Sequence, residues 1–403
     1  MRPLTQFLAI SLSAWMLAAC AGSPDPVARS APQPGPETAG EALKDFFSAV
    51  DRSGWPRSPA VLDWPTDQAL TRIAVGSCRS QEAPAPVLDA LLARDPDLFL
   101  YIGDNVYGDV WSLSPDMAVL KEAYGELSQQ EDFQRVAARV PILPIWDDHD
   151  YGMNDAGGSY YGKFGSEAIF ETYWGLEEHP MASRDGVYYS QTFGPEGERV
   201  QVIMLDTRFF RTALTRSPDR GAPGMERYIP SEADDQDMLG GEQWAWLEET
   251  LRQPAELRLL VSSVQVLADA HGWEAWKQLP QSQSRLFETI ARSEAGGVVL
   301  ISGDRHLSAL YRQTGVTDYP LYELTASSLN RPVRDENDEM SSNQLGAAYS
   351  RVNFGEIEID WQRGLLTFTV RDVDGHAVRD QSVALAEIGV ESRAMATMPR
   401  PGL

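Results

Sequence analysis

Short apolar runs alternate with helix-like stretches from about residue 70 onward. The runs lie at 72–75, 97–102, 141–146, 200–205, 257–264 and 298–302. Apolar residues spaced three and four apart predict helices at 85–94, 116–139, 241–252 and 283–293, with a shorter amphipathic helix at 41–50. Because strands that lack polar alternation are buried on both faces, the pattern predicts an α/β fold in which helices cover a layered sheet.

The pattern changes after about residue 305. Alternating, aromatic-containing runs with turn residues between them predict antiparallel strands of the same domain, at 308–312, 319–325, 353–361 and 365–371. Two long polar segments, 211–240 and 330–350, read as insertions that cap a site. No internal repeat is evident.

The N-terminus carries an export signal. Residues 4–19 are apolar, follow Arg2 and are too short to span a bilayer comfortably. They end in Leu17-Ala18-Ala19-Cys20, which looks like a bacterial lipobox. This predicts a lipoprotein signal peptide at 1–19 and acylation of Cys20. An ordinary signal peptide that happens to precede a cysteine is the alternative.

The rest of the chain then divides into two parts. Residues 20–40, rich in proline and glycine, predict a flexible tether, and 41–403 a single domain with a core at about 70–390. The expected location is exported and anchored to a membrane through lipid, on the periplasmic or cell-surface side. Ala21 favours the outer membrane in a Gram-negative host.

Composition narrows the possible partners. The 403 residues include 34 Lys and Arg against 59 Asp and Glu, a formal net charge of −25. Such acidity argues against a broad surface for nucleic acid, so an anionic substrate must be held by a metal or by a few arginines. If Cys20 is acylated, Cys78 is the one remaining cysteine, and it is a buried thiol, a nucleophile or a metal ligand.

Five apolar runs end in residues that ligate metals or transfer protons. The segments that follow them are Gly76–Arg79, Gly103–Tyr107, Asp147–Asp150, Asp206–Arg208 and Ser302–His306. Loops at the carboxyl ends of parallel strands converge on one crevice, so we expect these side chains to meet.

Without cations, either some carboxylates of the expected cluster are protonated or the loops do not converge, so a metal cluster is the economical interpretation. Carboxylates such as Asp104, Asp148 and Asp304 about 4 Å apart would repel by roughly 4 kcal/mol at an effective dielectric near 20. The donors are of two kinds, which predicts two kinds of metal. A thiolate, a phenolate and an imidazole suit iron or zinc, whereas carboxylates and the amide of Asn105 or Asn154 suit Ca²⁺ or Mg²⁺. Asp104 is the natural bridge between them.

These segments resemble the PhoD-like alkaline phosphatases, a branch of the calcineurin-like metallophosphoesterases related to the purple acid phosphatases. The resemblance covers roughly residues 70–375 and rests on the set of motifs in this order. They are Gly76-Ser77-Cys78, Gly103-Asp104-Asn105-Val106-Tyr107, Trp146 through Asp155, Leu205-Asp206-Thr207-Arg208, Met238 through Leu247, and Ser302-Gly303-Asp304-Arg305-His306.

The resemblance implies a four-layer α/β/β/α sandwich with mixed sheets, phosphomonoesterase or phosphodiesterase activity, and an Fe³⁺ plus Ca²⁺ cluster, with zinc or manganese as alternatives. Cys78 replaces the usual Asp-x-His, and Asp304 replaces one imidazole of the closing Gly-His-x-His. Gln265 lies where a further metal-binding histidine is expected. These departures favour Ca²⁺ over Zn²⁺ at the second position.

We assign roles on this basis. The transition metal is held by Cys78, Asp104, Tyr107 and His306, and the harder ion or ions by Asp104, Asp148, Asp304 and, more weakly, Asn154. Two metals about 3.5–4 Å apart would lower the pKa of a bridging water and aim the resulting hydroxide at phosphorus. His149 protonates the leaving oxygen, with Asp147 or Asp150 orienting its ring. The non-bridging oxygens contact Arg79, Arg208 or Arg305.

Two other functions fit parts of the sequence. The acidity, the tether and the 11 tryptophans suit a non-catalytic lipoprotein that binds Ca²⁺ or a glycan. A hydrolase that attacks another bond with Cys78 as nucleophile is the second. A phosphate ester is the expected ligand, with no protein partner. The preference for monoesters or diesters depends on how 211–240 and 330–350 fold.

Overall fold

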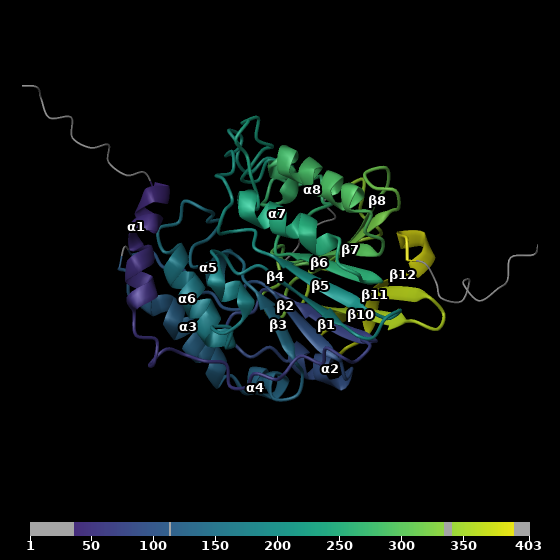
Figure 1. Cartoon of the computed structure of the whole chain (residues 1–403), viewed down its shortest axis with the longest axis horizontal. Helices are drawn as coiled ribbons and strands as arrows, with labels where there is room; N and C mark the ends of the chain where they lie inside the picture. The colour runs from purple at the N-terminus through teal and green to yellow at the C-terminus, as the bar shows by residue number, and fades with distance from the viewer. Residues whose placement is uncertain (1–35, 113, 334–340, 391–403) are drawn as a thin grey trace, which may run out of the picture. The chain divides into compact units, whose positions relative to one another are not determined.

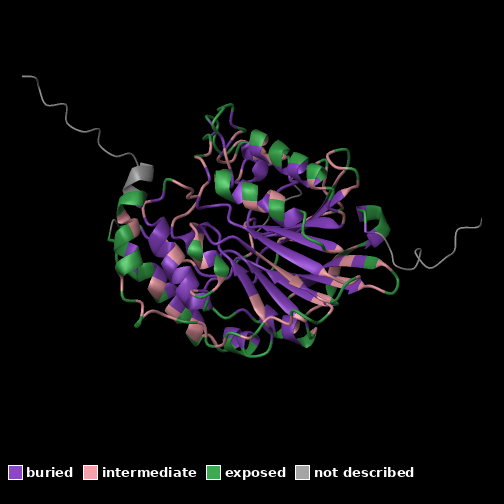
Figure 2. Ribbon diagram, viewed as in Figure 1, coloured by how far each residue is buried: buried purple, intermediate pink, exposed green. Residues whose placement is uncertain are grey.

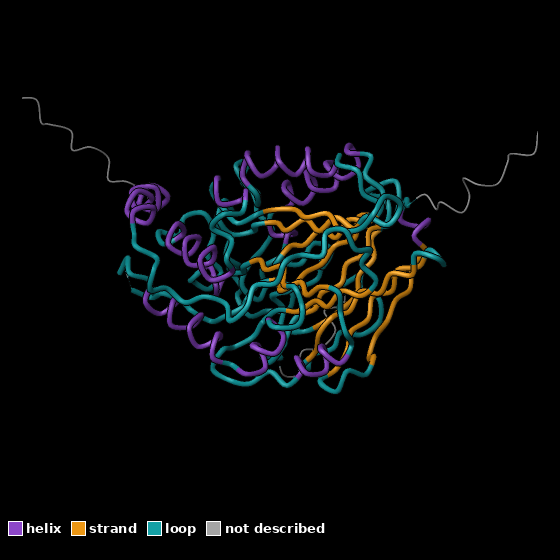
Figure 3. Tube along the Cα trace, turned by 60° about the horizontal axis from the view of Figure 1, so that its bottom comes forward, coloured by secondary structure: helices purple, strands orange, loops and turns teal. Residues whose placement is uncertain are grey.

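The computed structural model describes residues 36–112, 114–333 and 341–390, and contains two six-stranded mixed sheets (Figures 1 and 3). The first has the order β12-β11-β10-β1-β2-β3. Its strands are β1 (Arg72–Gly76), β2 (Leu98–Ile102), β3 (Ile142–Ile145), β10 (Asn353–Asp360), β11 (Leu365–Asp372) and β12 (Ala377–Ala384). Strands β1, β2 and β3 are parallel, and β10, β11 and β12 add antiparallel pairings.

The second sheet has the order β4-β5-β6-β7-β9-β8. Its strands are β4 (Tyr189–Phe193), β5 (Val200–Leu205), β6 (Leu257–Ser262), β7 (Val298–Ser302), β8 (Ser308–Gln313) and β9 (Leu321–Ala326). Strands β5, β6, β7 and β9 are parallel, and β4 and β8 are antiparallel edges.

Helices cover the outer faces of the two sheets (Figure 1). The second sheet lies under α7 (Gly240–Leu251) and α8 (Pro280–Ser293). The first sheet is flanked by α2 (Val87–Ala93), α3 (Ala118–Gln129), α4 (Glu131–Ala137) and α6 (Lys163–Trp174), and α1 (Pro36–Ala49) packs on α6. The short α5 (Asp148–Tyr151) and three 3₁₀ turns at Pro180–Ser183, Trp276–Gln278 and Leu385–Ile388 complete the described elements. This is the expected four-layer sandwich.

Burial on both faces explains the continuous apolar runs. In β5, Val202 and Met204 pack in the core between the sheets, whereas Ile203 and Leu205 pack under α7 and α8. Successive side chains of a strand point to opposite faces, so a strand between two apolar layers has few polar positions. Figure 2 shows the strands buried along most of their length.

The predicted elements are largely confirmed, with four differences. The helix expected at 116–139 is two helices, because Gln130 adopts an extended conformation between them. The helix expected at 41–50 begins at Pro36, inside the predicted tether, since proline is well suited to a first helical turn. Strands β4 and β12 and helix α6 were not predicted. The strand expected at 319–325 pairs antiparallel with β8 but parallel with β7.

The N-terminal predictions concern residues that lie mostly outside the described part of the chain. Contacts divide the chain into Met1–Gly35 and Pro36–Leu403, and both sheets belong to the second unit. The signal peptide, Cys20 and most of the tether lie outside the described residues. Among the described helices, none combines the length and the apolar character that crossing a membrane requires.

Candidate metal centre

The strand ends of the two sheets meet at one place. Ligand atoms of Cys78, Asp104 and His306 lie within 4.8 Å of one another, and so do those of Asp104, Asp148 and His149. A third group at the same spacing joins Asp147, Asp148 and Asp304. The convergence expected from the strand ends is therefore observed, and Asp104 and Asp148 each belong to two of these groups.

Two glycines permit this close approach. Gly103 has a φ of +103°, and a Cβ there would lie 2.5 Å from Cβ of Asp147. A Cβ on Gly303 would lie 2.6 Å from Oγ of Ser77, which follows β1 in the other sheet. Any larger residue at either position would separate the strand ends that carry the ligands.

Backbone strain is concentrated on the same residues. Cys78, Asp104, Asp304 and His306 have φ angles of 57°, 48°, 63° and 56°. Non-glycine residues pay about 1–3 kcal/mol for such conformations, which persist where the surroundings and function require them. Four of the seven predicted metal ligands are thus held in the left-handed region.

The donors expected for the transition metal form one hydrogen-bonded group. The Tyr107 hydroxyl donates to Oδ2 of Asp104 at 2.8 Å and lies 3.1 Å from Nε2 of His306. Sγ of Cys78 lies 3.4 Å from the same Asp104 oxygen and 3.0 Å from Oγ of Ser327. A cation among these atoms would take up the Asp104 oxygen together with sulfur, phenol and imidazole.

Without a cation, this group is electrostatically unfavourable. Burial and the nearby Asp104 carboxylate raise the pKa of the Cys78 thiol and of the Tyr107 hydroxyl well above their usual values. Burial and the Arg331 guanidinium lower the pKa of His306 to about 4, so its ring is neutral at neutral pH. A bound cation reverses the first two effects, because it favours the thiolate and phenolate.

In the described part of the chain, the clustered carboxylates also lack hydrogen-bond partners for some of their oxygens. Oδ1 of Asp104, Oδ2 of Asp147 and Oδ1 of Asp148 are buried without a hydrogen-bond partner among the described residues. Burial, reinforced by neighbouring carboxylates, raises the pKa of Asp104 and of Asp304 well above the usual range. Unpartnered buried oxygens are uncommon in native proteins, and hard divalent cations bind such oxygens. The residues therefore fit the predicted metals.

A cavity of about 340 Å³ opens over both groups of ligands. His149 and Asn154 line it beside the metal-binding carboxylates, and three arginines lie on its walls: Arg227, Arg305 and Arg331. The guanidinium of Arg331 lies 3.9 Å from the centre of the Tyr107 ring. Of these three arginines, the sequence predicted Arg305 alone. The site thus combines candidate metal ligands with cationic groups suited to an oxyanion.

Comparison with known proteins identifies the family. The model of the PhoD-like phosphatases matches residues 73–373. This chain belongs to that family. Its members are metal-dependent hydrolases of phosphoric ester bonds, which is the class of enzyme that the motifs predicted.

Solved structures extend the comparison to the fold. A structure described as PhoD has a TM-score of 0.59 at 14% identity, and the match covers 80% of this chain and 70% of that one. The protein TT1561 of Thermus thermophilus has a TM-score of 0.34 at 10% identity over 78% of this chain and 99% of that one, too low to support any conclusion. No curated protein matches the chain.

The partner of His149 in this PhoD-like phosphatase differs from the prediction. Nδ1 of His149 lies 2.6 Å from Oδ2 of Asp109, so Asp109, and neither Asp147 nor Asp150, orients the ring. Asp150 is fully buried and accepts from Asn105, at 3.1 Å from the backbone and 2.6 Å from the side chain, and from the backbone of Asp147. It closes a capping box on α5, so the structure gives Asp150 a structural role in place of the predicted contact with the ring.

The position of Arg208 also differs from the predicted one at the phosphate oxygens. Its guanidinium is fully buried and bonds Asp147 on one side, with Nε at 2.7 Å, and Glu274 on the other, with Nη1 at 2.7 Å. A buried guanidinium requires such partners, and both of its faces are used. Arg208 therefore neutralises the carboxylates beneath the site instead of contacting substrate. Arg79 is likewise buried against Asp132, away from the cavity.

The sequence missed two further acidic residues of the PhoD-like phosphatase site. Asp155 and Glu274 form a group with Asp148 in which ligand atoms lie within 4.8 Å of one another. Burial raises the pKa of Glu274 to about 7 although Arg208 and Arg211 oppose the shift. Asp155 belongs to the motif that follows β3, so the sequence alone could have identified it as a site residue. Glu274 lies in a segment without strand or helix between β6 and the turn Trp276–Gln278, and no local pattern marks it.

Replacement of Cys78 tests its assignment as a ligand. Cys78→Ser is expected to lower affinity for the softer metal more than the roughly 10–100-fold that loss of an outer-shell contact costs. The measurement is metal content per folded chain by mass spectrometry after dialysis. Ser327→Ala, which removes the hydroxyl 3.0 Å from Sγ, is the matched control and should show the smaller loss. Equal metal content in Cys78→Ser and the native protein would identify an inert buried thiol.

Proposed function

We propose that this PhoD-like phosphatase is an exported, membrane-anchored phosphoesterase that hydrolyses phosphate monoesters, diesters or both with the help of two kinds of metal ion. The observation that carries the proposal is the position of Asp104. Its Oδ2 lies within reach of a thiol, a phenol and an imidazole, and its ligand atoms also group with Asp148. A carboxylate that lies between a group of softer donors and a group of carboxylates suits a mixed-metal centre.

We propose Fe³⁺ and Ca²⁺ as the metals, with zinc or manganese as the alternatives for the softer position. Cys78, Tyr107 and His306 would hold iron together with Asp104. Asp148 and Asp304 would hold the harder ion, and Asn154, at the cavity wall, is a further candidate ligand. When bound, the cations would supply Lewis acidity and lower the pKa of a bound water.

The chain itself supplies binding and proton transfer. Arg305 and its neighbours on the cavity wall are suited to the non-bridging phosphate oxygens. His149 is the proton donor to the leaving oxygen. Although burial favours the neutral ring, the carboxylates of Asp148 and Asp104 and the bond to Asp109 raise the pKa of His149 to about 11 in the metal-free chain. Once Asp148 and Asp104 bind cations, Asp109 is the partner that favours the protonated ring needed for proton donation.

Chelation tests this function. We expect the protein to release p-nitrophenol from p-nitrophenyl phosphate, from bis(p-nitrophenyl) phosphate or from both, to lose this activity in EDTA, and to regain it when Ca²⁺ and iron are restored. The ratio of the two rates measures the preference between monoester and diester. Absence of both activities in folded protein that has bound its metals would contradict the proposal.

The membrane anchor rests on the sequence of residues 1–20. Acylation at Cys20 would hold the mature chain firmly, because each buried CH₂ contributes about 0.8 kcal/mol. We expect the native protein in the membrane fraction of a bacterial host and the Cys20→Ser variant in the soluble fraction. Membrane association that survives Cys20→Ser would rule out the lipid anchor.

A further inference from the structure

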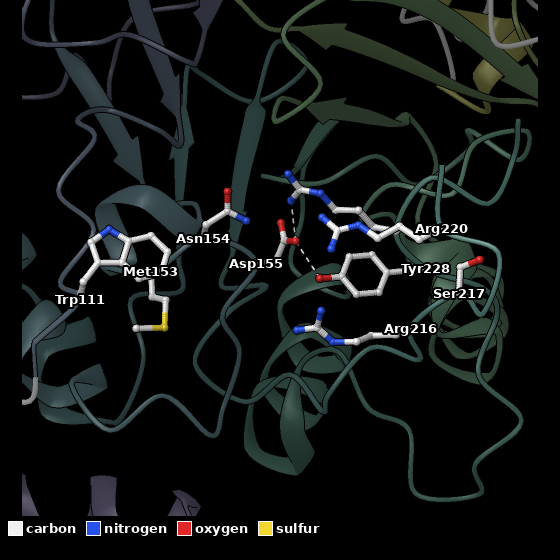
Figure 4. A pocket seen from close by; sticks show the side chains of 9 residues that line it. Trp111, Met153, Asn154, Asp155, Arg216, Ser217, Arg220 and Tyr228 are labelled. Atoms are coloured by element: carbon white, nitrogen blue, oxygen red, sulfur yellow. Dashed lines mark hydrogen bonds and ion pairs between the residues drawn. The ribbon is translucent and has the colours of Figure 1, made fainter. Parts of the chain in front are cut away.

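A second cavity, of about 470 Å³, adjoins the one over the metal ligands. The two cavities share three residues, Asn154, Asp155 and Arg227. Asp155 follows β3 and α5, whereas Arg227 comes from the long segment between β5 and α7. The predicted insertion at 211–240 therefore lines a cavity beside the site, and Figure 4 shows the side chains of this second cavity.

The wall formed by this insertion is positively charged. It carries Arg216, Arg220 and Arg227, and the single acidic residue that lines the cavity is Asp155. Asp155 is already bound by Nη1 of Arg227 at 2.6 Å and by the Tyr228 hydroxyl at 2.7 Å. Arg216 and Arg220 are exposed, and their guanidinium groups have no hydrogen bond or ion pair with any residue of the described ranges.

Backbone contacts of the loop fix the chain at Arg216. Arg216 and Tyr228 form an antiparallel bridge, and the Ser217 amide donates to the Arg227 carbonyl at 2.8 Å. The nearby Glu226 carboxylate accepts from the amides of Gly224 and Gly272, so it is not paired with the arginines. In Figure 4, Arg216 and Arg220 extend from this ribbon toward Asp155.

The opposite wall is apolar and aromatic. Trp111 and Met153 line it, and Trp111 is 77% exposed, the most exposed large hydrophobic residue among those described. An indole left in solvent beside a polar cavity is typical of a binding surface for a ring or an apolar group. Figure 4 shows Trp111 facing the arginine side across the cavity.

These features point to a ligand with two anionic groups. In a chain of net charge −25, two unpaired arginines on one cavity wall create a local site for an anion against the field of the whole molecule. A carboxylate or phosphate would pair with their planar guanidinium groups in bidentate fashion. Because the two cavities share Asn154, Asp155 and Arg227 in their linings, a molecule that spans this shared wall would reach both.

We propose that Arg216 and Arg220 form a second phosphate subsite, which selects organic phosphates that carry another phosphate group beyond the one that is hydrolysed. The segment between the two phosphates lies against Trp111, and a ring system suits that wall. The proposal rests on the proposed function, because it places the reacting phosphate at the metal centre.

Competition against p-nitrophenyl phosphate hydrolysis tests the subsite in the metal-loaded protein. We expect adenosine 3′,5′-bisphosphate to inhibit with a constant at least about tenfold below that of adenosine 5′-monophosphate, since a charged hydrogen bond contributes about 1.5–3 kcal/mol. The Arg216→Gln/Arg220→Gln variant should lose this preference. Trp111→Ala should weaken inhibition by both nucleotides. It should leave unchanged the ratio of the inhibition constants of fructose 1,6-bisphosphate and fructose 6-phosphate.

A matched variant controls for net charge. Arg139→Gln/Arg363→Gln removes two exposed arginines that line neither cavity, and it should keep the preference of the native protein. A preference below twofold in the native protein, or one that persists in Arg216→Gln/Arg220→Gln, would overturn the subsite.

If the proposed function is wrong, the subsite can still be tested by binding alone. If the metal-loaded protein does not hydrolyse p-nitrophenyl phosphate, calorimetric titration with adenosine 3′,5′-bisphosphate decides about the subsite alone. Weaker binding in Arg216→Gln/Arg220→Gln than in the charge control would support it, and equal binding would overturn it.

Discussion

Asp104→Asn is expected to lower kcat/KM by roughly a thousandfold or more, because loss of an outer-shell partner alone costs about 10–100-fold and Asp104 is a shared ligand. Asparagine keeps the size of the side chain but removes its negative charge. The Tyr107 hydroxyl and the Cys78 thiol both lie against the carboxylate oxygen that would be lost. Both metals should therefore bind less tightly in this variant.

Metal content and stability distinguish a ligand from a merely structural carboxylate. Both metals should fall below one per chain in Asp104→Asn. Asp132→Asn is the control, because Asp132 is buried and paired with Arg79 at 2.7 Å but lies outside the site. It should reduce stability and leave metal content per folded chain at the native level. A loss of activity of less than tenfold in Asp104→Asn would contradict the proposed centre.

In the metal-free protein, Asp104→Asn should stabilise the folded chain. Burial and the carboxylates of Asp148 and Asp147 raise the pKa of Asp104 above its unfolded value, although His149 opposes the shift. A raised carboxyl pKa destabilises the folded chain once the pH exceeds the unfolded pKa, near 4. The metal-free Asp104→Asn protein should thus unfold at a higher temperature than the metal-free native protein at neutral pH.

The sequence predicted the place of the site because that place follows from strand direction. Cys78, Asp104 and Asp304 come directly after buried strands, and the carboxyl ends of parallel strands share one edge. The prediction needed only the location of the strands, which their continuous apolar character supplied. Glycine-dependent contacts such as that of Gly303 with Ser77, between the two sheets, required the structure.

The hydrogen-bond partners within the site were harder to predict. Asp147 and Asp150 are three residues apart at the start of α5, a spacing typical of a capping box, so their structural role had a signal in the sequence. Asp109 had none, because it lies 40 residues before His149 in a segment without helix or strand. Glu274 lies 66 residues after Arg208, and such pairings depend on how distant loops pack.

His149→Gln is expected to lower kcat by about 10²–10⁴-fold on an alkyl phosphate, the usual contribution of a general acid. Glutamine retains a polar side chain but cannot donate the proton that the leaving oxygen needs. p-Nitrophenolate leaves without protonation, so the loss on p-nitrophenyl phosphate should be much smaller. The ratio of the two losses is the measurement, and equal losses on both substrates would show that His149 acts by some other means, such as binding a metal.

Asp109→Asn separates the role of Asp109 from that of the ring itself. Asp109 is one of the groups that raise the pKa of His149, after the carboxylates of Asp148 and Asp104. A general acid works only while protonated, so activity on the alkyl phosphate falls as the pH rises through the pKa of the acid. Removing the Asp109 charge lowers that pKa. The alkaline limb of the kcat profile should therefore move to lower pH in Asp109→Asn, whereas the profile of His149→Gln should lack that limb. An unmoved limb in Asp109→Asn would mean that the 2.6 Å contact only positions the loop.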